Sequence, residues 1–125
     1  MKTLLIPVTA AESGERAVRS LIEHPPTEPT EVELVAMASP LALTSGRAYV
    51  TPQRAEDAAR TIAGTWLMRL TPLLREAGIP VRTRIVIGRP DVEIEVAMHR
   101  ADVDSVLLPV GTPRLAAAHA LTVVG

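Results

Sequence analysis

Two continuous apolar segments constrain the fold of this chain more strongly than any other feature of its sequence. Residues 2–8 (KTLLIPV) and 103–110 (VDSVLLPV) are apolar along most of their length and lack the strict alternation of a strand with one face in water. Such segments are typical of strands covered on both faces, which occur mainly in parallel sheets flanked by helices. We therefore expect an α/β fold with a buried parallel sheet.

Strand and helix signals alternate along the chain, which is the order that builds a doubly wound parallel sheet. A first helix is expected to be capped by Ser13 and to stop at His24, before two prolines. A long helix begins with a capping Thr51 followed by Pro52 and ends at Gly78. The expected strands are residues 2–8, 30–37, 81–87, 103–110 and 120–124.

In three segments the sequence pattern has to be interpreted before an element or its position can be assigned. Residues 81–87 alternate apolar and polar side chains, which favours a half-exposed strand at the sheet edge. Residues 92–99 also alternate, but Asp91 can cap a helix there and a parallel sheet needs a crossover, so we predict a helix. Pro72 lies inside the long helix and removes a backbone hydrogen bond, so we expect a kink or break near residues 70–71.

The composition argues against several functional classes. A length of 125 residues predicts a single domain over residues 1–125, and a net charge of −1 offers no footprint for nucleic acid or an anionic membrane. The absence of cysteine excludes disulfides and thiolate chemistry, and no histidine pair has the spacing of a metal site. The apolar run at residues 4–11 is too short to span a bilayer and lacks the layout of a signal peptide, so we expect a cytoplasmic protein.

A ligand site in such a sheet is expected beyond the carboxyl ends of its strands, where the winding direction reverses. If the first and fourth strands are neighbours at that point, the loops at residues 7–13 and 109–114 meet there. Neither loop contains a pair of acids or a glycine-rich phosphate motif. We therefore assign no catalytic residue and no metal ligand.

Several segments together resemble the universal stress protein family. Residues 2–22 are similar to its first strand, turn and helix, and residues 32–40 (VELVAMASP) to its second strand. Residues 73–109 match its middle, including an Ala-Gly-hydrophobic-Pro turn, a Gly-x-Pro turn and an Ala-Asp-x-Asp run. The resemblance implies the adenine nucleotide alpha hydrolase-like fold, a doubly wound parallel five-stranded sheet in the order 3-2-1-4-5 with helices on both faces, and commonly a dimer.

The chain departs from the nucleotide-binding members of that family where they hold the nucleotide. Those members carry an acid just after the first strand, where this chain has Thr9. They follow the fourth strand with a Gly-x2-Gly-x9-Gly-(Ser/Thr) loop, whereas here Pro109 replaces the first glycine and Gly111 is out of step. Proline has no N–H to donate to a phosphate. The resemblance therefore implies the fold without implying tight nucleotide binding.

A residual pocket is predicted at the same place, and a degenerate turn without a ligand is the other interpretation. The predicted lining residues are Thr9, Met37, Gly111, Thr112 and Arg114. Thr9 and Met37 match positions that touch the nucleotide in the binding members. No resident cofactor is predicted, and ATP or AMP is disfavoured.

These observations predict a regulatory or interaction module of the universal-stress type, acting in a stress response without tight nucleotide binding. The alternative is a protein that binds ATP or AMP, or a weak nucleotidase, with a degenerate pocket. A phosphoacceptor domain is rejected because residues 9–11 and 88–90 lack the required acids. Residues 120–124 are apolar and end the sheet, so we expect a homodimer through this strand, with a further protein partner left open.

Overall fold

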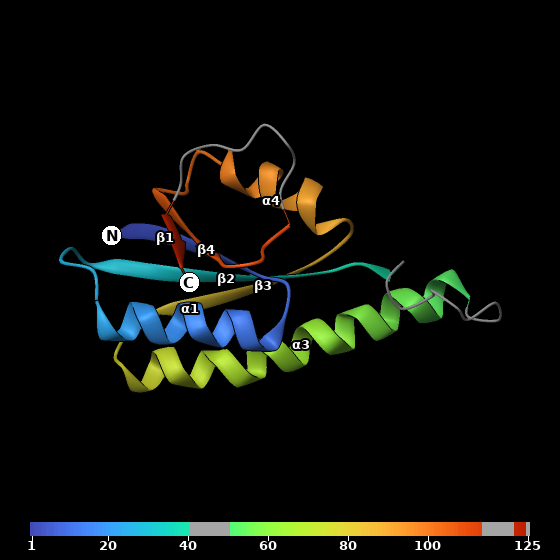
Figure 1. The fold of residues 1–125 in the computed structure, drawn as a ribbon, viewed down its shortest axis with the longest axis horizontal. Coiled ribbons are helices and arrows are strands. Elements are labelled where there is room, and N and C mark those ends of the chain that lie inside the picture. Colours follow the sequence, from blue (N-terminus) through green and yellow to red (C-terminus); the bar gives the residue numbers. More distant parts are fainter. Residues whose placement is uncertain (41–50, 114–121, 125) are drawn as a thin grey trace.

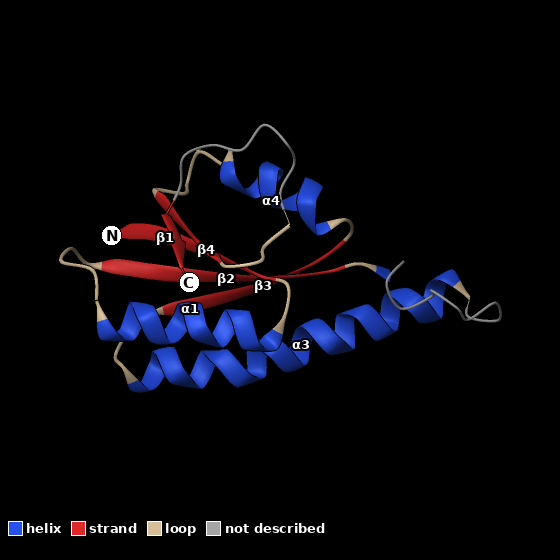
Figure 2. Cartoon of the chain, viewed as in Figure 1, coloured by secondary structure: helices blue, strands red, loops and turns tan. Residues whose placement is uncertain are grey.

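A computed structural model describes residues 1–40, 51–113 and the backbone of 122–124. Strands and helices alternate through these residues, as Figures 1 and 2 show. The elements are β1 (Lys2–Val8), α1 (Ala11–Glu23), β2 (Thr30–Ala38), α3 (Pro52–Glu76), β3 (Val81–Ile87), α4 (Pro90–Met98), β4 (Ser105–Pro109) and β5 (Thr122–Val124).

The strands form a parallel sheet in the order β3-β2-β1-β4-β5, so a parallel α/β fold is confirmed. The pairing of β1 with β4, through Leu4 with Ser105 and Leu5 with Val106, confirms the predicted contact between the first and fourth strands. β3 lies at one edge, as the alternation of its sequence indicated. β5 is three residues long and pairs with Leu107, Leu108 and Pro109 of β4.

Helices cover both faces of this sheet, with α1 and α3 on one face and α4 on the other (Figure 1). Alternate residues of each strand point to opposite faces. Leu4, Ile6 and Val8 of β1 therefore pack in the cluster with α1 and α3, whereas Leu5 packs in the cluster with Ile94 of α4. This double burial explains why the strands of the sheet centre are nearly continuous apolar runs.

The helix starts differ from the prediction at two caps. α1 begins at Ala11 after an extended Ala10, so Ser13 lies inside the first turn and is not the cap. α4 begins at Pro90, which places Asp91 in the first turn, where its carboxylate accepts a hydrogen bond from the N–H of Val92 at 3.0 Å. The Thr51 cap is confirmed, because its hydroxyl accepts a hydrogen bond from the N–H of Arg54 at 3.2 Å.

Of the two outcomes predicted at Pro72, a break is wrong, because α3 is continuous from Pro52 to Glu76, whereas a kink stays a prediction. Pro72 and Met68 both lie on the exposed side of the helix. Because Pro72 has no N–H, the carbonyl of Met68 has no hydrogen-bond donor within the helix and can bind water instead. Leu70 and Leu74 are fully buried on the other side and hold the helix on the sheet through both flanking turns.

Two strands are shorter than expected. The fourth strand covers Ser105–Pro109 instead of residues 103–110, because Val110 already belongs to the following turn and is 45% exposed. The last strand covers Thr122–Val124 instead of residues 120–124. The predicted helix at residues 92–99 is confirmed as α4, whose last residue is Met98. Among the described helices, none is both long and apolar enough to cross a membrane.

Candidate functional site

A pocket of about 460 Å³ lies at the carboxyl ends of the strands, at the position where sheets of this class bind ligands. It is bounded by the residues after β1 and β2, the start of α4, the turn after β4 and one face of α3. The N-terminal part of α3 extends past the ends of the strands and overhangs this region (Figure 1). The lining residues are Thr9, Ala10, Met37, Ala38, Ser39, Ala59, Ile62, Trp66, Pro90, Gly111 and Pro113.

The turn after β4 closes on itself. The N–H of Thr112 donates to the carbonyl of Pro109 at 3.1 Å, and the Thr112 hydroxyl donates to the same oxygen. Gly111 has a φ of +85°, which a type II turn requires at its third residue and which favours glycine. Pro113 has no N–H. Both hydrogen-bond donors of Thr112 are therefore used within the turn and are not available to a phosphate.

The structure brings three of the predicted pocket residues together. Thr9, Met37 and Gly111 all line the pocket, although Met37 is almost fully buried and presents only a small surface. Thr112 is not among the lining residues, because its hydroxyl is turned onto Pro109. Arg114 lies outside the described residues.

Sequence reasoning missed the contribution of α3 to the pocket. Ala59, Ile62 and Trp66 line it from one face of this helix. Trp66 also packs against the hydrophobic core between the helices and the sheet. Their spacing of three and four residues is the signal that places them together. What the sequence did not reveal is that this face of the helix reaches the carboxyl ends of the strands.

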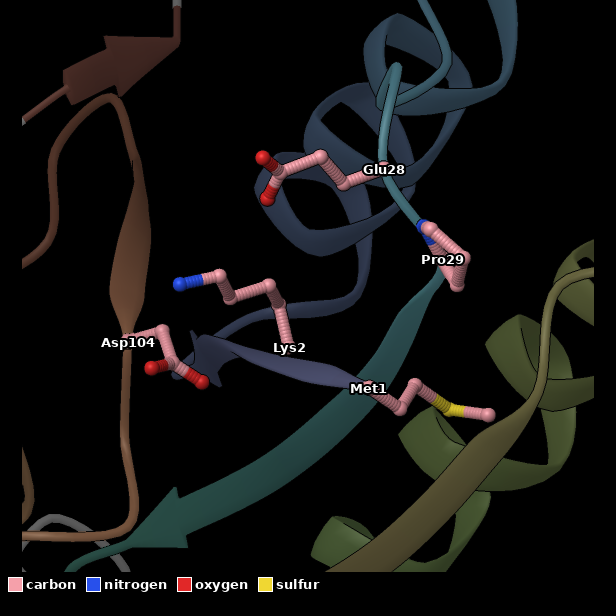
Figure 3. A pocket seen from close by; sticks show the side chains of 5 residues that line it. All are labelled: Met1, Lys2, Glu28, Pro29 and Asp104. Atoms are coloured by element: carbon pink, nitrogen blue, oxygen red, sulfur yellow. The ribbon is translucent and has the colours of Figure 1, made fainter.

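A second, larger hollow of about 600 Å³ lies at the opposite end of the sheet. Figure 3 shows Met1, Lys2, Glu28, Pro29 and Asp104 around it. Asp104 accepts a hydrogen bond from the N–H of Thr3 at 2.7 Å and so fastens β4 to β1. No group of three or more metal-ligating side chains occurs in the described parts of the chain. Because ligands of such sheets bind at the carboxyl ends of the strands, we take the smaller pocket as the candidate site.

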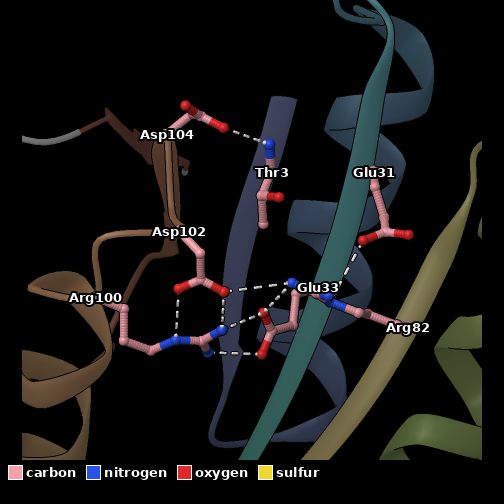
Figure 4. A network of polar contacts seen from close by, with 7 residues as sticks. All are labelled: Thr3, Glu31, Glu33, Arg82, Arg100, Asp102 and Asp104. Carbon is pink, nitrogen blue, oxygen red and sulfur yellow. Dashed lines mark hydrogen bonds and ion pairs between the residues drawn. The ribbon is translucent and has the colours of Figure 1, made fainter. Parts of the chain in front are cut away.

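A network of charged side chains joins β2, β3 and the residues after α4 near the amino ends of the strands (Figure 4). Glu33 of β2 is buried, with its side chain 4% exposed, and Arg100 donates to both of its oxygens at 2.7 and 3.0 Å. Arg82 of β3 donates to Glu33 at 3.2 Å and pairs with Glu31 at 3.3 Å. Arg100 also donates to both oxygens of Asp102, at 3.1 and 2.7 Å.

These contacts set the ionisation of the buried acid. Burial acts to raise the pKa of Glu33, but the hydrogen bonds and positive charge of Arg100 and Arg82 outweigh it and hold the pKa below its usual value. The hydrogen bond from Arg100 likewise lowers the pKa of Asp102. Sequence reasoning did not predict this network, since residues 30–37 were read only as a strand, but a glutamate inside an apolar strand is a signal that could have found it.

Comparison with solved structures shows the fold. A universal stress protein family member from Burkholderia pseudomallei superposes with a TM-score of 0.69 at 14% identity, covering 87% of this chain and 81% of that one. The protein UspA from Lactobacillus plantarum gives 0.62 at 16% identity, covering 99% and 85%. A family protein from Arabidopsis thaliana, solved with AMP bound, gives 0.59 at 17% identity, covering 87% and 76%.

Two other comparisons returned nothing. No protein-family model matches the sequence, and no curated protein matches it. Identities below one fifth show a common fold and leave the activity open. The chain therefore has the fold of the universal stress proteins.

Proposed function

We propose that this chain, which folds as universal stress proteins do, is a divergent member of their family that acts as a regulatory or interaction module and binds no nucleotide tightly. The observation that carries the proposal is the turn after β4. Pro109 accepts both hydrogen bonds that Thr112 can donate, and Pro113 can donate none. A loop that binds phosphate must instead point several free N–H groups at its ligand.

The electrostatics of the pocket support the same proposal. Phosphates in proteins are usually held by arginine, lysine or clustered N–H groups. Among the described residues that line the pocket, none carries a charge. Thr9 stands where nucleotide-binding members of the family carry an acid. A nucleotide would therefore lose the water around its phosphates without gaining comparable contacts from these residues.

The alternative is a protein that binds ATP or AMP, or a weak nucleotidase. The structure with the same fold and AMP bound favours this alternative. The pocket also lies at the end of the sheet where ligands of such folds bind, and its volume of about 460 Å³ is within the usual range for small ligands.

A thermal unfolding scan with ATP, AMP and magnesium separates the two. A ligand that binds only the native state raises the free energy of unfolding by RT ln(1 + L/Kd), where L is the free ligand concentration. With about 0.1 mM ATP we expect the unfolding midpoint to rise by less than about 2 °C. A micromolar binder would raise it by about 10 °C under the same conditions, and that result would establish the alternative.

We further propose that the module is a cytoplasmic homodimer joined through β5, with a further protein partner left open. β5 is the last strand of the sheet and pairs only with β4 among the described strands. An edge strand leaves N–H and C=O groups unpaired, and antiparallel pairing with a second copy satisfies them in a self-complementary contact.

Substitution of Val123 tests the dimer. Val123→Pro removes an N–H from β5 and Val123→Lys adds a charge to it, so both variants should sediment as monomers or become insoluble. Val96→Lys is the matched control, because Val96 is 60% exposed on α4 and is not part of the edge strand, so the dimer should be unchanged. A wild-type protein that is monomeric at micromolar concentration, or a dimer that survives both changes at Val123, contradicts this arrangement.

A further inference from the structure

We infer that the pocket at the carboxyl ends of the strands binds an uncharged, largely apolar small molecule. The inference deepens the proposed function and rests on it, because it assigns a ligand class to the pocket once tight nucleotide binding is set aside. It is drawn from the side chains that line the pocket, from the chemistry of the turn after β4, and from the pocket's size.

The lining is apolar, with a few polar groups that can orient a ligand. Ile62 and Trp66 are the larger apolar side chains that line the pocket, and Met37 adds a small apolar surface. Alanines and prolines make up most of the remaining described lining. Thr9 and Ser39 bring hydroxyl groups, and the indole of Trp66 brings an N–H donor. A mainly apolar cavity with a small number of polar groups is the usual form of a small-molecule site. The half-buried Trp66 offers an aromatic face that a flat ring system can stack against.

The described residues that line this pocket offer no partner for a charged group. An ionised group that leaves water needs a paired charge or hydrogen bonds in return. The described lining residues include no ionisable side chain, and the Thr112 donors are committed to Pro109. Among the described arginines, Arg89 beside the lining residue Pro90 already pairs with Asp91 at 2.7 Å. Arg82 and Arg100 pair with Glu33 near the amino ends of the strands. A neutral ligand avoids this cost, and its apolar surface is stabilised by leaving water.

A matched pair of probes tests the ligand class. N-phenyl-1-naphthylamine is neutral, and 8-anilinonaphthalene-1-sulfonate has the same ring system with an added sulfonate. The protein contains one tryptophan, Trp66, so quenching of its emission reports on binding near the pocket while the fluorescence of the probe rises. We expect the neutral probe to bind with an affinity at least about tenfold higher than the sulfonate. Absence of binding by the neutral probe, or equal affinity for both probes, overturns the inference.

Two variants place the binding in the pocket. Ile62→Arg and Ser39→Arg introduce a charge at two half-buried lining positions, and each should lower the affinity for the neutral probe by about tenfold. Met68→Arg is the matched control on the same helix, because Met68 is 77% exposed and does not line the pocket. If Ile62→Arg fails to fold, Ser39→Arg alone decides. Unchanged affinity in a folded lining variant overturns the inference.

Competition by ATP keeps this test distinct from that of the proposed function. Displacement of the neutral probe by micromolar ATP would show that the proposed function is wrong, since the pocket would then accept phosphates. A protein that binds neither ATP nor the neutral probe would agree with the proposed function and overturn the present inference. Binding of the neutral probe that ATP does not displace at micromolar concentration supports both.

Discussion

The two ends of the sheet differ in where their charges lie. At the amino ends of the strands, Arg82 and Arg100 pair with three carboxylates, and one of these, Glu33, is buried. At the carboxyl ends, the pocket is lined by described residues that carry no charge. In folds of this class the carboxyl ends bind ligands, so the end with more ionic chemistry is not the end where a ligand is expected.

The comparison shows that a cluster of paired charges in this fold can stabilise the structure without marking the place where a ligand binds. Each arginine of the network already donates to carboxylates at hydrogen-bond distance, so the network holds the residues after α4 and two strands together. The pocket, in contrast, depends on backbone conformation and apolar contacts. Removing a charge at the amino ends of the strands should therefore lower the free energy of unfolding. At the carboxyl ends, a change of backbone conformation should alter the stability of the turn, and an added charge should weaken ligand binding.

The largest effect is expected from removing the buried acid. Glu33→Ala leaves Arg100, whose side chain is 23% exposed, without its main partner and should lower the free energy of unfolding by about 3 kcal/mol. Glu31→Ala is the control, because Glu31 pairs with the same Arg82 at the surface and should cost less than about 1 kcal/mol. Urea titration measures both. Equal losses would show that the burial of Glu33 has no consequence for stability.

A smaller effect is expected from the turn beside the pocket. Gly111→Ala forces a side chain into a positive φ and should cost about 1–2 kcal/mol, although nothing lies within 4 Å of the added methyl group. Gly64→Ala is the matched control, since it also has open space but lies within α3. Alanine favours a helix more than glycine does, so this control should gain up to about 1 kcal/mol. A loss in both variants would point to crowding instead of backbone strain.

The smallest stability difference is expected from pH. The folded pKa of Glu33 lies below its usual value, because its hydrogen bonds to Arg100 and Arg82 outweigh the effect of burial. The unfolded state therefore takes up the proton first as the pH falls. The stabilisation from this pair is complete above the unfolded pKa and is lost as the pH falls through the folded pKa. Stability should therefore decrease as the pH falls below about 5, where the unfolded carboxyl begins to take up its proton.

A variant isolates this contribution from those of other acids. Hydrogen bonds from arginines also lower the pKa of Glu15, Asp91 and Asp102, so the wild type loses stability in acid for several reasons. Glu33→Gln cannot take up a proton in this range, and its urea midpoint should fall less steeply with pH than that of the wild type. Parallel curves for the two proteins would contradict the assigned role of Glu33.

Much of the fold could be predicted because the burial of each strand determines the pattern of apolar residues along it. The continuous apolar segment of β1 and the alternation of β3 indicated a central and an edge strand, and the pairing of β1 with β4 followed from the resemblance. Helix starts were less predictable, because α1 and α4 begin after Ala10 and Arg89, whose side chains make no capping hydrogen bond. The effect of Pro72 depended on which side of α3 meets water, and that is a property of the packed protein.

The candidate site could be predicted only in part. Loops that follow neighbouring strands must meet, so Thr9, Met37 and Gly111 were found. The contribution of Trp66 depends on how α3 is positioned along the sheet, which periodicity alone does not specify. The polar network escaped prediction because its members are distant in sequence, as Glu33 and Arg100 illustrate, and only the fold brings them together.

Titration calorimetry with ATP and magnesium tests the central claim most directly. The absence of charge among the described lining residues and the closed turn after β4 predict a dissociation constant for ATP weaker than about 0.1 mM. This corresponds to a binding free energy of at most about 5–6 kcal/mol. Heat that fits a single site with micromolar affinity would contradict the claim and would show that this pocket still binds nucleotide.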